Sequence, residues 1–76
     1  MRKKLMKAIA EHVAAEYPNE ACGVVVQSGR AQNYIPCRNI ADNPTEAFTL
    51  APEDRLAAQE QGEIIMIVPS HPDVVL

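Results

Sequence analysis

Hydrophobic residues along the chain follow first a helical and then a strand-like pattern. In residues 3–16, apolar side chains recur every three or four positions, which predicts an amphipathic helix. Its apolar stripe is predicted to contain Leu5, Met6, Ile9, Ala10, Val13 and Tyr17. The helix is expected to end at Tyr17, because a residue that precedes proline avoids helical backbone angles.

A β-hairpin is predicted next. Residues 22–28 contain an apolar run, and the Ser28-Gly29 pair that closes it is typical of a turn. Residues 31–38 are expected to return as the partner strand. Pro36 has no backbone N–H to donate to a neighbouring strand, so this second strand is expected to be either an edge strand or a bulged one.

The last part of the chain is predicted to hold a loop, a short strand, a helix and a final strand. Residues 39–45 are polar and predict a loop, while alternation in residues 47–50 predicts a short strand. A helix over 52–61 is indicated by proline and acidic residues in its first turn and by the glycine that follows it. Residues 63–68 contain five consecutive apolar residues, which predicts a fully buried strand.

This α-β-β-β-α-β order predicts an α+β fold of mixed α/β layers, formed by one domain over residues 1–76. Hydrophobic residues make up 47% of the chain, as expected for a folded protein. Aromatic residues are few, and a chain this short buries only about 60% of its unfolded surface. Such a thin core favours a fragment or an oligomer, so we expect the chain to self-associate.

Charge and cysteine content narrow the possible functions. The net charge of −3 gives no electrostatic basis for binding nucleic acid. No segment approaches the roughly 18 apolar residues of a membrane span, and the basic N-terminus lacks the apolar region of a secretory signal. A cytoplasmic location is therefore expected, with Cys22 and Cys37 as reduced thiols. A disulfide between them is the alternative.

His71 is the first candidate for chemistry, because it follows the predicted strand 63–68. The prolines on either side hold the backbone extended, and a histidine fixed at the carboxyl end of a strand suits a metal ligand. The alternative is an ordinary surface histidine. A hydrolytic zinc site needs three protein ligands and a water. Pro69, two residues before His71, has no donor atom to contribute.

Glu20 is the second candidate, since it lies just before the first predicted strand. A carboxylate there could act as general base on a metal-bound water, or it could be a solvated loop residue. Other polar residues are interpreted structurally: Cys22 as a small buried side chain, His12 as a surface residue and Glu53-Asp54 as partners of the helix dipole. Possible further metal ligands, none at a recognisable spacing from His71, are His12, Cys22, Cys37 and Asp73.

Four segments, in order, resemble the JAMM/MPN (JAB-domain) metalloproteases, and within them the phage tail assembly branch. They are residues 17–23, 34–39, 48–54 and 62–72. The family has a glutamate, then His-Ser-His-Pro, then a later Ser-x-x-Asp. The two histidines and the aspartate hold zinc, and the glutamate is the base on the zinc water that attacks a peptide or isopeptide carbonyl. The resemblance implies a truncated JAMM/MPN, cytidine-deaminase-like fold.

The resemblance assigns the general base to Glu20 and one metal ligand to His71. Pro69 stands at the position of the first histidine, and the Ser-x-x-Asp would fall beyond Leu76. One of three zinc ligands therefore remains in this chain. This implies a zinc peptidase or isopeptidase domain of a phage or prophage tail assembly protein that binds no zinc and is catalytically incompetent here. The alternative is a non-catalytic tail-assembly or protein-binding module that keeps only the fold.

The expected partners follow from the same resemblance. They are phage tail proteins, a second copy of the chain and, in the family, a peptide or isopeptide substrate. Neither nucleic acid nor a membrane is expected to bind. The expected location is the cytoplasm of the bacterial host or the phage tail.

Overall fold

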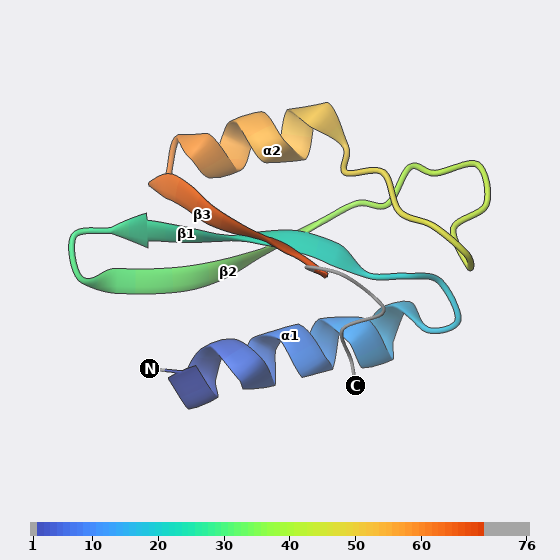
Figure 1. Cartoon of the computed structure of the whole chain (residues 1–76), viewed down its shortest axis with the longest axis horizontal. Coiled ribbons are helices and arrows are strands. Elements are labelled where there is room, and N and C mark those ends of the chain that lie inside the picture. The colour runs from blue at the N-terminus through green and yellow to red at the C-terminus, as the bar shows by residue number, and fades with distance from the viewer. Residues whose placement is uncertain (1, 70–76) are drawn as a thin grey trace.

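The computed structural model describes residues 2–69, which form a three-stranded antiparallel sheet between two helices (Figure 1). The elements are α1 (Arg2–Glu16), β1 (Cys22–Ser28), β2 (Ala31–Cys37), α2 (Pro52–Gln59) and β3 (Glu63–Val68). The strand order is β2-β1-β3, so β1 is central. Helix α1 lies against one face of the sheet and α2 against the other, which confirms the predicted α+β class.

Strand β1 is the core of the protein. Every residue from Ala21 to Val26 except Gly23 belongs to the buried hydrophobic set. Side chains alternate between the two faces of a strand, so Cys22, Val24 and Val26 share one face. They form a cluster with Ala58 of α2, while Val25 lies on the face that α1 covers. Burial on both faces explains why this strand is a nearly continuous apolar run.

The prediction of a fully buried strand over residues 63–68 is wrong. Strand β3 pairs with β1 on one side and has no further strand on its other side within residues 2–69. Ile65, Met66 and Ile67 are 44%, 45% and 38% exposed. The pairing also shifts by one residue, which leaves Ile65 without a partner on β1. An edge strand can carry the same apolar run as a central strand, so the sequence pattern did not distinguish them.

The expected strand over residues 47–50 is also absent. The segment forms an isolated bridge between Asn39 and Leu50, and the observed order is α-β-β-α-β. The Asn39 side chain replaces strand pairing as the element that holds this loop. Its Oδ1 accepts hydrogen bonds from backbone N–H groups, and its Nδ2 donates to backbone carbonyls. The donors are Ala41 (3.1 Å) and Thr49 (3.0 Å), and the acceptors are Glu20 (2.9 Å), Ala47 (3.0 Å) and Pro44 (3.4 Å).

The other predicted elements are confirmed with small changes in their ends. Strand β2 contains Pro36 and is an edge strand with a regular register, the first of the two alternatives expected for it. The β1–β2 turn contains Gly29 with a φ of 62°, in the left-handed region that favours glycine. Helix α2 ends at Gln59, two residues earlier than predicted.

Helix α1 depends on packing rather than on its own sequence. Lysines lie in its first turns and Glu16 ends it, which opposes the helix dipole at both ends. The half-buried side of the helix contains Leu5, Ala8, Ile9 and His12. The predicted stripe is therefore only partly right: Met6, Val13 and Tyr17 are exposed. No helix among the described residues is long and apolar enough to span a membrane.

The contrast between β1 and β3 predicts two very different responses to side-chain truncation. Val24→Ala removes buried methyl groups and leaves a cavity, so we expect a loss of about 2 kcal/mol in the free energy of unfolding. That corresponds to a melting temperature lower by about 10 °C. Ile65→Ala, at an exposed position, is expected to cost less than about 1 kcal/mol. Urea denaturation at low protein concentration measures both, and equal losses would contradict this account of the core.

The role of Asn39 gives a second prediction. Asn39→Ala leaves several backbone groups of the loop without their partner and is expected to cost about 2–3 kcal/mol. The amide hydrogens of Ala41 and Thr49 should exchange faster in the variant. Asn43→Ala is the matched control, because the Asn43 amide makes one exposed hydrogen bond of 3.4 Å, to Glu46. It is expected to cost less than about 0.5 kcal/mol. The argument fails if the two variants are equally stable.

Candidate functional site

The structure brings Glu20 close to Pro69, the residue that follows β3. Both line one cleft of about 310 Å³ beside the C-terminal end of α1. The remaining lining residues are Val13, Tyr17, Pro18, Asn19 and Ala21. Glu20, just before β1, therefore shares this cleft with Pro69, just after β3. His71, the metal ligand implied by the resemblance, lies outside the described residues.

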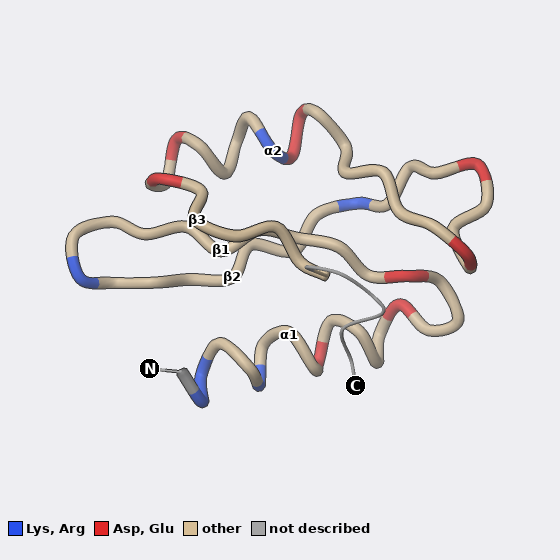
Figure 2. Tube along the Cα trace, viewed as in Figure 1, with Lys and Arg blue, Asp and Glu red and all other residues tan. Residues whose placement is uncertain are grey.

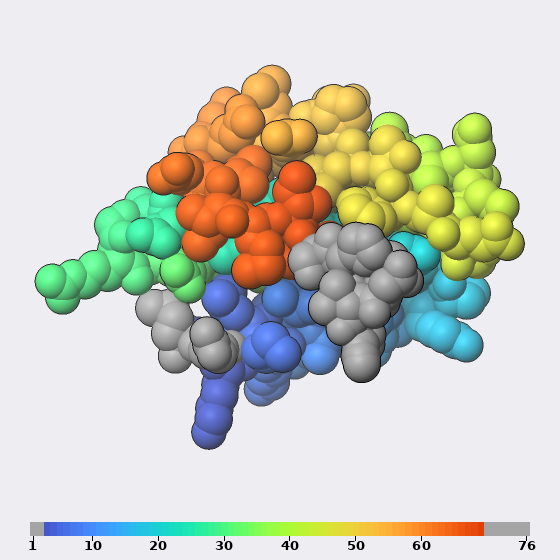
Figure 3. All heavy atoms as spheres, in the orientation of Figure 1, coloured from blue at the N-terminus to red at the C-terminus, as the bar shows by residue number. Residues whose placement is uncertain are grey.

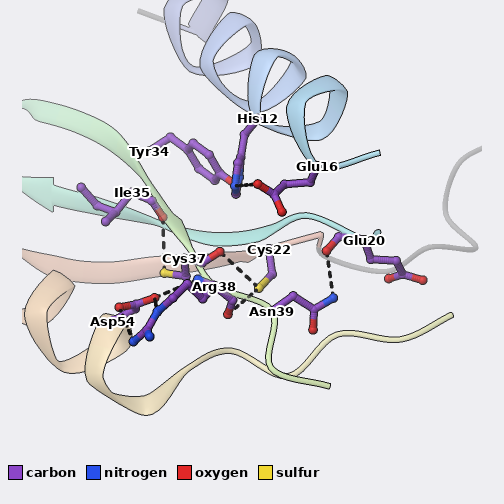
Figure 4. A network of polar contacts seen from close by, with 10 residues as sticks. All are labelled: His12, Glu16, Glu20, Cys22, Tyr34, Ile35, Cys37, Arg38, Asn39 and Asp54. Atoms are coloured by element: carbon purple, nitrogen blue, oxygen red, sulfur yellow. Dashed lines mark hydrogen bonds and ion pairs between the residues drawn. The ribbon is translucent and has the colours of Figure 1, made fainter. Parts of the chain in front are cut away.

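The backbone of Glu20 is held from two directions. Its N–H donates to the carbonyl of Pro44 at 2.7 Å, and its carbonyl accepts from Asn39 Nδ2 at 2.9 Å. Figure 4 shows the second contact and the carboxylate of Glu20 pointing away from it. Within residues 2–69 no hydrogen bond reaches that carboxylate. The Asn39 loop, residues 38–51, thus fixes the backbone position of Glu20.

The described residues do not supply a zinc ligand set. Within residues 2–69, no three His, Cys, Asp or Glu side chains lie close enough together to hold a metal ion. Pro69 carries no donor atom at the position where the resemblance implies a histidine. His12 lies in a different cleft, and Asp73 lies outside the described residues. No catalytic step through zinc can be built from the residues described.

A second polar group joins α1 to β2. His12 Nδ1 lies 2.7 Å from the Tyr34 hydroxyl, and His12 Nε2 lies 4.0 Å from Glu16 Oε2 (Figure 4). Tyr34 lies directly over Gly23, where an added Cβ would be 2.5 Å from the hydroxyl oxygen. Burial raises the pKa of Tyr34 to about 12, so the phenol stays protonated and serves as a hydrogen-bonding group.

The expectation that His12 is a surface residue is therefore wrong. It is half-buried because it lies three residues after Ile9, on the same side of the helix. That spacing was visible in the sequence, but the partner Tyr34 was not, since only the β1–β2 pairing brings it under α1. The cleft beside this group has a volume of about 530 Å³. Its lining residues are His12, Glu16, Pro36, Cys37, Arg38, Asn39, Ile40 and Asp54.

Arg38 and Asp54 fasten the N-terminal turn of α2 to the end of β2. Asp54 Oδ2 accepts from the Arg38 backbone N–H at 2.8 Å and from Nε at 3.0 Å, and Oδ1 accepts from Nη2 at 3.2 Å. These hydrogen bonds lower the pKa of Asp54. Asp54 was predicted only to complement the helix dipole. The structure adds this specific partner for it.

Both cysteines are free and buried. They face each other across β1 and β2, where the Cys22 thiol donates to the carbonyls of Arg38 (3.5 Å) and Cys37 (3.8 Å). Burial and then the neighbouring Cys37 raise the pKa of Cys22 to about 11, and burial also raises the pKa of Cys37. Thiolate is therefore scarce at neutral pH, which favours the structural interpretation of Cys22 over a nucleophile.

Comparison with known proteins gives the family. Residues 2–75 match the family described as prokaryotic homologs of the JAB domain. The "Tail tip assembly protein K" of Escherichia phage N15 is 55% identical over 73 residues, which are 96% of this chain and 30% of that protein. No solved structure matches the chain. Because the family match spans nearly all 76 residues, the chain belongs to the prokaryotic JAB-domain family.

Proposed function

We propose that this chain is the JAB-type module of a phage or prophage tail assembly protein, and that it acts in assembly without zinc-dependent peptidase activity of its own. The observation that carries the proposal is the 55% identity to the tail tip assembly protein of phage N15. The chain spans 30% of that relative, so the role of the whole relative reaches this chain only as part of the proposal. The proposed partners are phage tail proteins, met in the host cytoplasm or in the tail.

The donor set at the cleft supports a role without zinc chemistry. The family mechanism needs a metal-bound water for the glutamate to activate. Pro69 cannot bind zinc, and a single imidazole from His71 cannot hold zinc against water. On this proposal Glu20 has no polarised water to act on.

The second candidate is a working zinc peptidase or isopeptidase. One observation favours it: Glu20 still shares a cleft with the residue that follows β3. On this candidate, the Glu20 carboxylate would serve as the base in that cleft. This candidate requires ligands from residues other than Pro69, and His71 and Asp73 are the nearest in sequence.

Metal content separates the two candidates. We expect the purified chain, after dialysis, to retain less than about 0.1 zinc per chain, because too few ligands are present. Pro69→His alone is expected to leave zinc content and peptidase activity unchanged, since on this proposal no third protein ligand joins the two imidazoles. One tightly held zinc per chain, lost in His71→Ala, would overturn the proposal and support the peptidase.

A chimera tests the role in tail assembly. Residues 2–75 would replace the matching segment of the phage N15 protein, and infectious phage would be counted. We expect the chimera to support tail assembly, because this segment acts through its surface and not through zinc. A chimera that carries Pro69→His should give the same yield. If only the histidine version produced phage, the segment would contribute metal chemistry, and the second candidate would be correct.

A further inference from the structure

The two cysteines of the chain are placed directly opposite each other in the β1–β2 ladder, as the partners Cys22 and Cys37. Opposed residues point to the same face of a sheet, and both thiols belong to the core cluster with Val24, Val26 and Ala58. Such residues have Cα atoms about 4.5–5.5 Å apart, within the range of about 4.4–6.8 Å that a disulfide spans. The backbone therefore already has the spacing that a disulfide between them requires.

In the reduced chain, hydrogen bonds hold the two thiols on different acceptors. The Cys22 thiol donates to the carbonyl of Arg38 at 3.5 Å, and the Cys37 thiol donates to the carbonyl of Ile35 at 3.5 Å. Figure 4 shows the two sulfur atoms directed to these separate carbonyls. A change of side-chain rotamer, without a change in strand register, is the movement that brings the sulfur atoms together.

The surroundings of the pair make it slow to react at neutral pH. Cys22 and Cys37 are 0% and 6% exposed, in a molecule whose surface shows β3 between α1 and α2 (Figure 3). Burial raises the pKa of both thiols, that of Cys22 to about 11, and only the thiolate attacks a disulfide. Neither strand carries a charged residue (Figure 2), and Arg38, which follows β2, is engaged by Asp54. These properties suit a response to sustained oxidation and not a catalytic thiol.

We propose that Cys22 and Cys37 form a redox switch that closes to a cross-strand disulfide when a small disulfide such as glutathione disulfide is in excess. One protein thiolate attacks the S–S bond of the oxidant, which forms a mixed disulfide and releases one thiol. The second protein thiolate attacks that mixed disulfide, which forms the cross-strand bond and releases the second thiol. Two electrons pass from the protein to the oxidant, and the two thiol protons reach the released thiols through solvent.

The disulfide would tie together the ends of two strands that adjoin both clefts. Glu20 lies two residues before Cys22, and Arg38 directly follows Cys37. The carbonyl of Arg38 would lose the Cys22 thiol as a donor but keep the backbone N–H of Ala51, at 3.1 Å. Oxidation therefore leaves this carbonyl with a partner, and the oxidised chain is expected to keep its fold. This inference does not depend on the proposed role in tail assembly.

Glutathione buffers of increasing oxidised-to-reduced ratio provide the test, with the 76-residue chain equilibrated at mildly alkaline pH both folded and unfolded in urea. After acid quenching and alkylation, intact mass gives the fraction in which both thiols are joined. Because the fold and the disulfide must stabilise each other equally, the equilibrium constant for closure should be about tenfold or more larger in the folded chain than in urea. The oxidised chain should also melt about 5 °C or more above the reduced chain.

A matched control separates direct opposition from mere closeness in sequence. Cys37→Ala combined with Pro36→Cys moves the second thiol by one residue, to the other face of β2. The covalent loop stays nearly the same length, yet folding should give this variant no gain in the equilibrium constant. Circular dichroism shows whether the variant is folded. If it is not, Cys37→Ala combined with Gln32→Cys takes its place, because Gln32 pairs with Gln27 at the far end of the ladder.

Three outcomes would overturn the proposal. One is a gain on folding that is smaller than expected, which would show that the folded strands oppose the bond. Another is a stable mixed disulfide with glutathione as the end product in the folded chain. The third is an equal gain in the displaced-thiol control, which would show that the opposed positions of the two cysteines are not the cause.

Discussion

Burial of β1 on both faces is the constraint around which the rest of the structure is arranged. Val24, Val25 and Val26 are each at most 1% exposed, and no other element has consecutive residues so completely buried. Two strands must therefore pair with β1, and a helix must cover each face. Burial also explains the two cysteines, which are small apolar side chains in this position and whose thiols stay protonated.

The Asn39 amide is the second point on which the arrangement depends. Phe48 and Leu50 of the Asn39 loop pack against the core cluster, and its backbone groups also need hydrogen-bonding partners. One side chain provides several of them, and the same side chain holds the carbonyl of Glu20. The position of the candidate base is thus linked to a loop about twenty residues later in the chain. A substitution in that loop should shift the backbone of Glu20, although no residue of the loop lines the cleft.

The frame of the described residues holds without a metal ion. The frame depends on β1, the Asn39 loop and the Arg38–Asp54 contact, none of which needs a metal. Pro69, which follows β3, can therefore carry a side chain without a donor atom at no cost to these contacts.

The sequence by itself determined both helices, three of the strands and the family, because these follow from local periodicity and short motifs, and Pro36 limited β2 to an edge or a bulged strand. It did not determine that β3 is exposed, since an apolar run has the same appearance in a central strand and at an edge. It predicted a strand over residues 47–50 because alternation was the visible signal there. Most partners of Asn39, Tyr34 and Asp54 were decided only by tertiary structure, because, apart from Ala41, they lie 5 to 22 positions away. The proximity of Glu20 to Pro69 likewise depends on the pairing of β3 with β1, because no local sequence pattern encodes such a long-range contact.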